Sequence, residues 1–169
     1  ALEEHHTAQV IEREPDKAGV PHRRIGATGV LATLTGGKGP GPIVALRADI
    51  DALPMQERHE TDYCSQIDGK MHACGHDGHM AMVLELGRRI RTKQALPHNI
   101  LLLFQPAEET TGGARRLCET GVLERLRVKA VFALHLWPGL SAGMIAGLPG
   151  PMMARSTEVT FTAEGRCAH

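Results

Sequence analysis

Hydrophobic positions along this chain alternate between strand-like runs and helix-like spacing. Near-continuous apolar segments, of the kind that a sheet buries on both faces, predict strands within residues 42–54, 99–109 and 129–138. Apolar side chains recur at helical spacing over residues 77–93. Two shorter helices are predicted over residues 2–14 and 112–121. The chain is therefore expected to alternate strands with helices.

Turn-forming residues mark where these elements end. Pro15 is expected to stop the first helix, because proline lacks the N–H group that a helix interior needs. The segment "GVLATLTGGKGPGP" is expected to be a strand that runs into a Gly/Pro-rich loop, which we interpret as a hairpin connection. Asp77 or His76 would cap the start of the long helix.

The last residues of the chain have a different period. Val159, Phe161 and Ala163 alternate with polar residues, which predicts a half-exposed strand. We interpret "GLPGPMMAR" as the crossing from a first domain, residues 1–150, into the start of a second, residues 151–169. Alternating strands and helices in the first domain predict an α/β sheet with helices on its faces. Its site would gather outside the carboxyl ends of the strands.

Composition and charge narrow the class of protein. Lys plus Arg and Asp plus Glu both number 19, so no net charge draws the chain toward nucleic acid or anionic lipid. Apolar runs such as residues 100–104 are far shorter than the ~20 residues of a membrane span. The cysteines, at positions 64, 74, 118 and 167, form no CxxC pair. We expect a soluble, cytoplasmic protein that acts on small molecules and not on nucleic acid or at a membrane.

Potential metal ligands follow the buried strands or begin the long helix. The segments concerned are "RADIDALP", "HACGHDGH", "QPAEE" and "ALHLWP". Zinc accepts thiolate, imidazole and carboxylate together, so Cys74, His76, His135 and one of the adjacent Glu108 and Glu109 make a coherent ligand set. The other glutamate would accept a proton from the activated water.

These residues also have plainer interpretations. Cys74 beside a histidine fits a nucleophile with its base, although such enzymes usually draw the histidine from a distant segment. His135 fits a hydrogen-bonded core histidine, and the glutamate pair fits solvated turn residues. His72 and His79 fit ligand support or helix capping better than ligation, because a first shell rarely uses every nearby imidazole.

Taken together, the motifs resemble a known family. "RADIDALP", "KMHACGHDGH", "FQPAEE" followed by "GGA", and "LHLWP" followed by "GPMMA" occur in this order and spacing in metal-dependent amidohydrolases of the aminoacylase and carboxypeptidase superfamily. The branch is that of hippurate hydrolases, indole-acetyl-amino-acid hydrolases and N-acyl-amino-acid deacylases. The resemblance covers essentially the whole chain. It implies a mixed, largely parallel sheet flanked by helices, as in zinc peptidases, followed by the first strand of an α+β lid and dimerisation domain.

Roles for individual residues come with this resemblance. The family's counterpart of Cys74 bridges two metal ions, and the counterparts of His76, Glu109 and His135 are further ligands. The counterpart of Glu108 is the general base and acid.

Supporting residues are implied in the same way. Asp51 matches an aspartate that orients a ligand, and Asp49 stands where the wider superfamily has a histidine ligand. His169, in "GRCAH", matches a lid histidine that helps to bind the scissile carbonyl, often across a dimer. Relatives have an additional early helix and a C-terminal segment with one more histidine ligand, neither of which is in these 169 residues. The second metal is therefore expected to be weak or absent in this chain.

The activity that the resemblance implies is hydrolysis of the amide bond of an N-acyl amino acid or a similar small conjugate. The enzyme would hold two divalent metal ions per full-length subunit and form a homodimer through its lid. Thiolate favours zinc, whereas carboxylate and imidazole ligands also admit manganese, cobalt or nickel. A non-catalytic metal-binding fragment and a cysteine nucleophile that acts without metal are the alternatives that the sequence leaves open.

Overall fold

The computed structural model describes residues 3–36, 41–93, 96–110, 112–154 and 159–166. It divides the chain into two compact units, Ala1–Leu136 and Trp137–His169. The domain boundary expected near residue 150 stays a prediction. Within the described residues, the helices and strands belong to the first unit. Their bounds are α1 His5–Ala18, β1 His22–Ile25, β2 Gly29–Leu34, β3 Ile43–Asp49, α2 His76–Arg91, β4 Asn99–Gln105, α3 Gly113–Glu119, α4 Val122–Arg125 and β5 Val128–Ala133.

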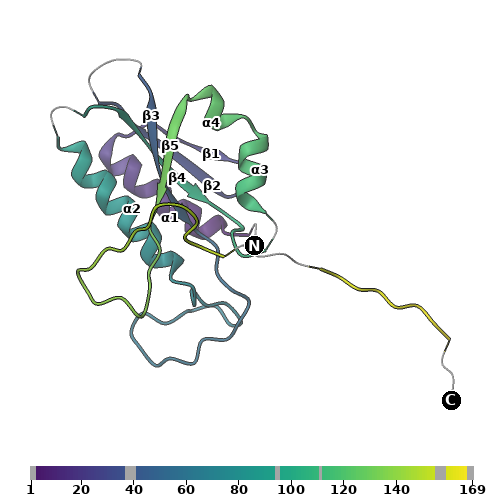
Figure 1. The fold of residues 1–169 in the computed structure, drawn as a ribbon. Helices are drawn as coiled ribbons and strands as arrows, with labels where there is room; N and C mark the ends of the chain where they lie inside the picture. Colours follow the sequence, from purple (N-terminus) through teal and green to yellow (C-terminus); the bar gives the residue numbers. More distant parts are fainter. Residues whose placement is uncertain (1–2, 37–40, 94–95, 111, 155–158, 167–169) are drawn as a thin grey trace. The chain divides into compact units, whose positions relative to one another are not determined.

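The strands form one mixed sheet in the order β1-β2-β4-β3-β5 (Figure 1). β2 is antiparallel to both of its neighbours, β1 and β4. β3 is parallel to both of its neighbours, β4 and β5. The predicted α/β class is therefore confirmed: the sheet is mixed and helices flank it.

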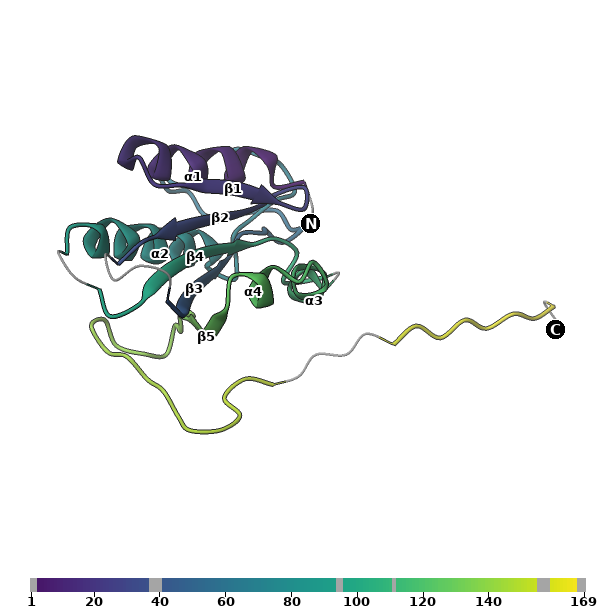
Figure 2. The same ribbon diagram turned by 90° about the horizontal axis from the view of Figure 1, so that it is seen from above.

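Two apolar cores cover the two faces of this sheet. On one face, α1 and α2 pack on the strands through side chains such as Ile11, Val83 and Leu102. On the other face, α3 and α4 contribute Leu117 and Val122 (Figure 2). A strand that is covered on both faces needs apolar side chains at successive positions, which explains the near-continuous apolar runs of β3 and β4.

Helix α1 continues through Pro15, so the prediction that proline would stop it is wrong. Ala8, Ile11 and Pro15 form a buried stripe at helical spacing, and packing of this stripe offsets the hydrogen bond that proline cannot donate. The helix ends instead at Gly19, which has φ 63° and donates its N–H to the Asp16 carbonyl. In α1, packing of the buried stripe therefore outweighs the tendency of proline to end a helix.

The hairpin predicted between β2 and β3 is also wrong. The hairpin of the structure joins β1 to β2, with Ile25 paired to Gly29, and β4 lies between β2 and β3. No apolar period marks β1, whose sequence is HRRI, so the pattern of hydrophobic residues did not reveal it.

Strand β5 is an edge strand and not the buried strand that its apolar run predicts. It pairs with β3 alone among the described residues. Val131 and Phe132 are consequently 49% and 60% exposed. An apolar run therefore located the strand correctly but did not indicate how many neighbours it has.

The described residues of the second unit are exposed turns and irregular backbone. The strand predicted around Val159 to Ala163 is absent from residues 159–166, because no described residue pairs with them. His169 lies outside the described residues. Neither unit, in its described part, contains a helix that is both long and apolar enough to cross a membrane.

Candidate functional site

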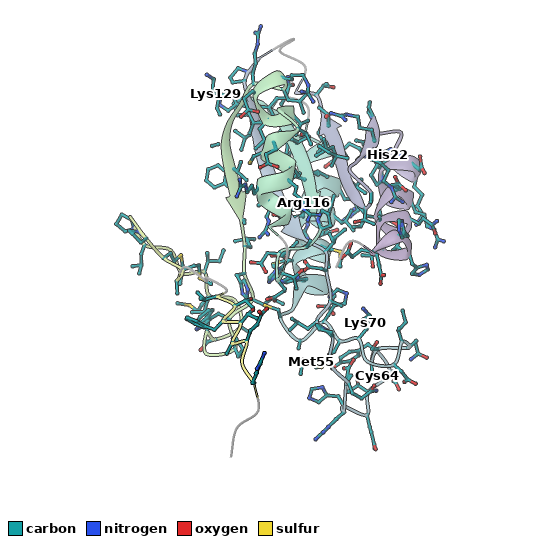
Figure 3. The ribbon with its side chains drawn as sticks, turned by 90° about the vertical axis from the view of Figure 1, so that its right-hand side faces the viewer. His22, Met55, Cys64, Lys70, Arg116 and Lys129 are labelled. Carbon is teal, nitrogen blue, oxygen red and sulfur yellow. The ribbon has the colours of Figure 1, made fainter. Side chains whose placement is uncertain are left out.

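Three parallel strands, β3, β4 and β5, end at the same edge of the sheet. A long loop, residues 50–75, leaves this edge and leads into α2. Figure 3 shows Met55, Cys64 and Lys70 on the loop, at the end of the first unit opposite to Lys129 near the start of β5. Polar residues that follow these three strands therefore share one edge with the start of α2.

The turn before α2 presents Cys74 and His76, which are two positions apart in the chain. Gly75 is the N-cap of α2 and has φ 82°, a left-handed conformation that glycine adopts at little cost, in place of the predicted Asp77 or His76 cap. Its N–H bonds the His72 carbonyl at 3.1 Å, which closes the turn. His76 begins the helix and is buried, whereas Cys74 is partly exposed.

The His76 ring has one nitrogen bound and one nitrogen free. Nδ1 lies 2.8 Å from the backbone oxygen of Asp51, and because a carbonyl only accepts, Nδ1 carries the proton of this bond. Nε2 is buried and has no hydrogen-bond partner among the described residues. It lies 3.7 Å from Glu109 Oε1 and 3.9 Å from Glu108 Oε2. A buried lone pair that faces carboxylates requires a cation or a proton to offset its desolvation.

Cys74, His76 and Glu109, here called the Cys74 cluster, offer ligand atoms that all lie within 4.8 Å of one another. His135 follows β5, and its Nε2 lies 3.6 Å from the Cys74 Sγ. Sulfur, imidazole nitrogen and carboxylate oxygen together suit a borderline-soft divalent ion. The residues present thus fit a metal of this kind.

Asp51 connects two members of this cluster. Its carboxylate Oδ2 accepts the Glu109 backbone N–H at 3.0 Å, and its carbonyl holds His76. Burial alone would raise the pKa of Asp51, but the His76 ring and the backbone N–H groups of Glu109 and Glu108 outweigh burial and lower the pKa to about 2. The carboxylate is therefore charged throughout the physiological range.

The same surroundings raise the pKa values of three neighbouring groups, Cys74, His76 and Glu108. Burial, and then the hydrogen bond and charge of Glu109, raise the pKa of Cys74 to about 12. Burial would lower the pKa of His76, but the hydrogen bond with Asp51 and the charge of Asp49 outweigh it and raise this pKa. Burial and the charge of Glu109 likewise raise the pKa of Glu108. Each shift favours the protonated form, as expected where carboxylates crowd together.

A second group, Asp49, His76 and His79, here called the Asp49 cluster, also has ligand atoms within 4.8 Å of one another. His79 lies 2.6 Å from Asp49 through Nδ1 and accepts the Leu136 backbone N–H at its other nitrogen. Its ring lies edge-on to that of His135, with centroids 4.6 Å apart. The two clusters share His76 and differ in how many of their ligand atoms are already bound to protein groups.

Sequence reasoning selected most of the residues at this edge. Cys74, His76 and Glu109 come together, and His135 and Glu108 lie beside them. It missed Arg47 and Gln105. Arg47 donates to Asp49 Oδ2 through Nη1 at 2.8 Å and to Gln105 Oε1 through Nε at 2.9 Å. A charged residue within the apolar run of β3 was the available signal.

Known proteins resemble this chain over most of its length. The profile of the peptidase family M20/M25/M40 matches residues 45–166. An IAA-amino acid hydrolase of Arabidopsis thaliana is 42% identical over 169 residues, which cover 99% of this chain and 38% of the relative. The N-acetylcysteine deacetylase of Bacillus subtilis is 41% identical over 143 residues, 84% of this chain and 37% of the relative.

Solved structures agree with this match. A Bacillus subtilis protein described as a dinuclear metal-binding peptidase of the M20 family superimposes with a TM-score of 0.75 at 39% identity, covering 81% of this chain and 38% of that one. The chain spans less than half the length of the relatives it matches. Since the family profile matches well over half of its residues, the chain belongs to the peptidase family M20/M25/M40.

Proposed function

We propose that the full-length protein hydrolyses the amide bond of N-acyl amino acids or similar small amide conjugates in a metal-dependent reaction. The observation that carries the proposal is the buried Nε2 of His76, which has no hydrogen-bond partner in the described part of the chain and lies near the Cys74 thiol and the Glu109 carboxylate. The family membership supports it, and so do the two related hydrolases, one named for IAA-amino acids and one for N-acetylcysteine.

In this proposal Cys74, His76, Glu109 and His135 hold divalent metal. A bound divalent ion would act as a Lewis acid that polarises the amide carbonyl and acidifies the attacking water. Four ligands are few for two metal shells, so a second ion would need further ligands. Zinc is our first choice of metal because of the thiolate, and manganese, cobalt and nickel are the alternatives.

Glu108 acts as the base and then the acid. Its carboxylate is 41% exposed, so water and substrate reach it, and burial together with the charge of Glu109 raises its pKa above the usual value of a glutamate. It takes the proton from the attacking water at one oxygen and returns it to the leaving nitrogen. His169, beyond the described residues, is proposed to bind the scissile carbonyl oxygen.

A cysteine nucleophile fits this site less well. A catalytic thiol needs a lowered pKa, whereas burial and the neighbouring glutamates raise the pKa of Cys74 to about 12. Without a cation, Cys74 therefore stays protonated and unreactive at neutral pH. The cytoplasmic location and the homodimer remain predictions.

The test is a substrate panel on the full-length protein together with metal analysis by mass spectrometry. We expect bound divalent metal and turnover of at least one class among N-acetyl, N-benzoyl and indole-acetyl amino acids. A chelator should abolish turnover, and added zinc, manganese or cobalt should restore it. Bound metal without turnover of any substrate would favour a non-catalytic metal-binding protein, and turnover that survives chelation would refute the metal mechanism.

A further inference from the structure

Both ring nitrogens of His79 are used by protein groups. The Leu136 backbone N–H donates to Nε2 at 2.9 Å, so Nε2 carries no proton, and the ring proton is on Nδ1. Nδ1 donates this proton to Asp49 Oδ1 at 2.6 Å. The ring is nearly completely buried, at 1% exposed. His79 is thus a neutral imidazole with no lone pair left for a metal ion.

Both carboxylate oxygens of Asp49 also accept hydrogen bonds from protein groups. Its second oxygen, Oδ2, accepts the Arg47 guanidinium at 2.8 Å, and Arg47 in turn holds Gln105. Gln105, Arg47, Asp49 and His79, here called the polar brace, therefore form one chain of hydrogen bonds that ends on the Leu136 N–H. The brace ties together β3, the end of β4, α2 and the segment after β5.

The end of the brace lies beside His135. Pairing between β5 and β3 ends at Ala133, so the sheet ladder does not hold residues 135 and 136. The His79 bond fixes the backbone at Leu136, and Leu136 in turn accepts the His135 Nδ1–H at 2.7 Å through its carbonyl. The His79 ring also contacts the His135 ring edge to face.

We propose that His79 is a positioning residue: its bond to the Leu136 N–H holds His135 beside the Cys74 thiol. This inference rests on the proposed function, because it assigns to His135 a place among the metal ligands. It also decides between the two clusters, since the Asp49 cluster then serves as support and does not bind an ion of its own. Groups that orient metal ligands in this way typically change metal affinity by ~10 to 100-fold.

Two amide variants of the full-length protein isolate the bond. His79→Gln extends an amide about as far as Nε2, so its oxygen still accepts the Leu136 N–H. His79→Asn reaches only as far as Nδ1, so it still bonds Asp49 but leaves Leu136 unpaired. Both lose the ring contact with His135. His22→Asn is the matched control, because His22 on β1 (Figure 3) also joins a carbonyl, of Val20, and a carboxylate, of Asp16.

Zinc affinity of the metal-free proteins is measured by competition with a chelator, and hydrogen–deuterium exchange is measured for the peptide that contains Leu136. We expect His79→Asn to bind the same number of ions ~10 to 100-fold more weakly and to exchange faster at Leu136. We expect His79→Gln to recover most of both, and His22→Asn to match the wild type. Loss of a whole ion in either His79 variant would make His79 a ligand and overturn the inference. Unchanged affinity in His79→Asn would overturn it as well.

A measurement on the wild type applies even if the variants do not fold. Long-range ¹H–¹⁵N spectra must show His79 as the Nδ1–H tautomer with and without metal, and the Nε2–H tautomer would overturn the inference. A wild-type protein that binds no divalent ion would refute the proposed function itself, and the inference with it. That failure is visible before any variant is measured, so the two failures are distinguishable.

Discussion

The Cys74 cluster and the Asp49 cluster share His76, and in each of them the ligand atoms lie within 4.8 Å of one another, yet they are suited to different tasks. In the Cys74 cluster, the His76 Nε2 is buried without a partner among the described residues. In the Asp49 cluster, His79 and Asp49 each make two hydrogen bonds to protein groups. Residue types and distances are similar, so neither of them distinguishes a ligand from a support.

What separates the clusters is the count of free lone pairs. A metal ion needs a ligand atom that no proton or protein donor already occupies. The Asp49 cluster contains Asp49 next to Arg47, so its charge is already balanced. The Cys74 cluster has the Glu109 carboxylate and no arginine bonded to it among the described residues, so a metal cation would balance its charge.

The largest effect is expected for Glu108→Gln, which removes the proposed proton acceptor and keeps the shape of the side chain. We predict that kcat falls by ~10² to 10⁴-fold because the amide cannot take a proton from water. KM and metal content should stay close to those of the wild type. Steady-state kinetics and metal analysis of the full-length protein measure these quantities.

Glu109→Gln is the matched control for this prediction, because the neighbouring glutamate is the proposed ligand. It should lose metal affinity together with activity. If instead Glu108→Gln loses metal and Glu109→Gln retains it, the two glutamates have exchanged roles. If Glu108→Gln keeps full kcat, the assignment of the base is wrong.

The next effect concerns stability and the polar brace. Arg47→Met removes the cation from Asp49, whose side chain is only 3% exposed, and leaves a buried carboxylate without charge compensation. We predict a loss of about 3 kcal/mol in the free energy of unfolding of the full-length protein. Denaturant titration followed by circular dichroism measures the change.

Arg24→Met is a suitable comparison, because Arg24 also pairs with a carboxylate, Glu12, far from the site. That pair is partly exposed, at 30% and 22%, so its loss should cost at most about 1 kcal/mol. Equal losses in the two variants would mean that the Arg47 pair is no more than an ordinary surface ion pair.

Local pattern was sufficient to predict the parts of the site that lie on single elements. Apolar runs located β3 and β4, and their last residues placed Asp49 and the glutamate pair at one edge. Helical spacing located α2 and hence His76 at its start. These features depend on residues close together in the sequence, which is why the sequence contains them.

Other features depend on partners that are distant in the sequence. Arg47 and Gln105 meet across 58 positions, and β4 lies between β2 and β3, which no local pattern indicates. The role of His79 is set by a backbone N–H 57 positions away, and a backbone group has no side-chain signature in the sequence. A histidine ligand and a histidine support therefore look alike until the fold brings their partners together.

Metal binding should also depend on pH in a direction that the site determines. The raised pKa values of Cys74, about 12, and of His76 mean that both groups hold protons where the metal would bind. Each ion that binds must displace the proton of the Cys74 thiol. Below the raised pKa of His76 it must also displace a proton from the His76 ring. We predict that affinity rises ~10-fold per pH unit above the raised pKa of His76 and more steeply below it.

Calorimetry of zinc binding in buffers of different ionisation enthalpy counts these protons. Cys74→Ser serves as the comparison, because without a thiol the proton of Cys74 is no longer released, and the count should fall by about one. Binding to the wild type without proton release would contradict the assignment of Cys74 as a ligand.

The smallest effect is expected for a substitution that changes only the packing around Leu136, the residue on which the polar brace ends. A Cβ on Gly78 of α2 would lie 2.6 Å from the Leu136 Cδ1, so Gly78→Ala pushes on the Leu136 side chain but leaves its N–H free to bond His79. The Leu136 side chain is 46% exposed and can rotate away, while alanine favours the helix by about 1 kcal/mol. We predict unchanged or slightly higher thermal stability and zinc affinity within ~3-fold of the wild type, well below the ~10 to 100-fold change of a lost positioning bond. A loss as large as that of His79→Asn would show that His135 is positioned by the packing of Leu136 and not by the hydrogen bond to its backbone.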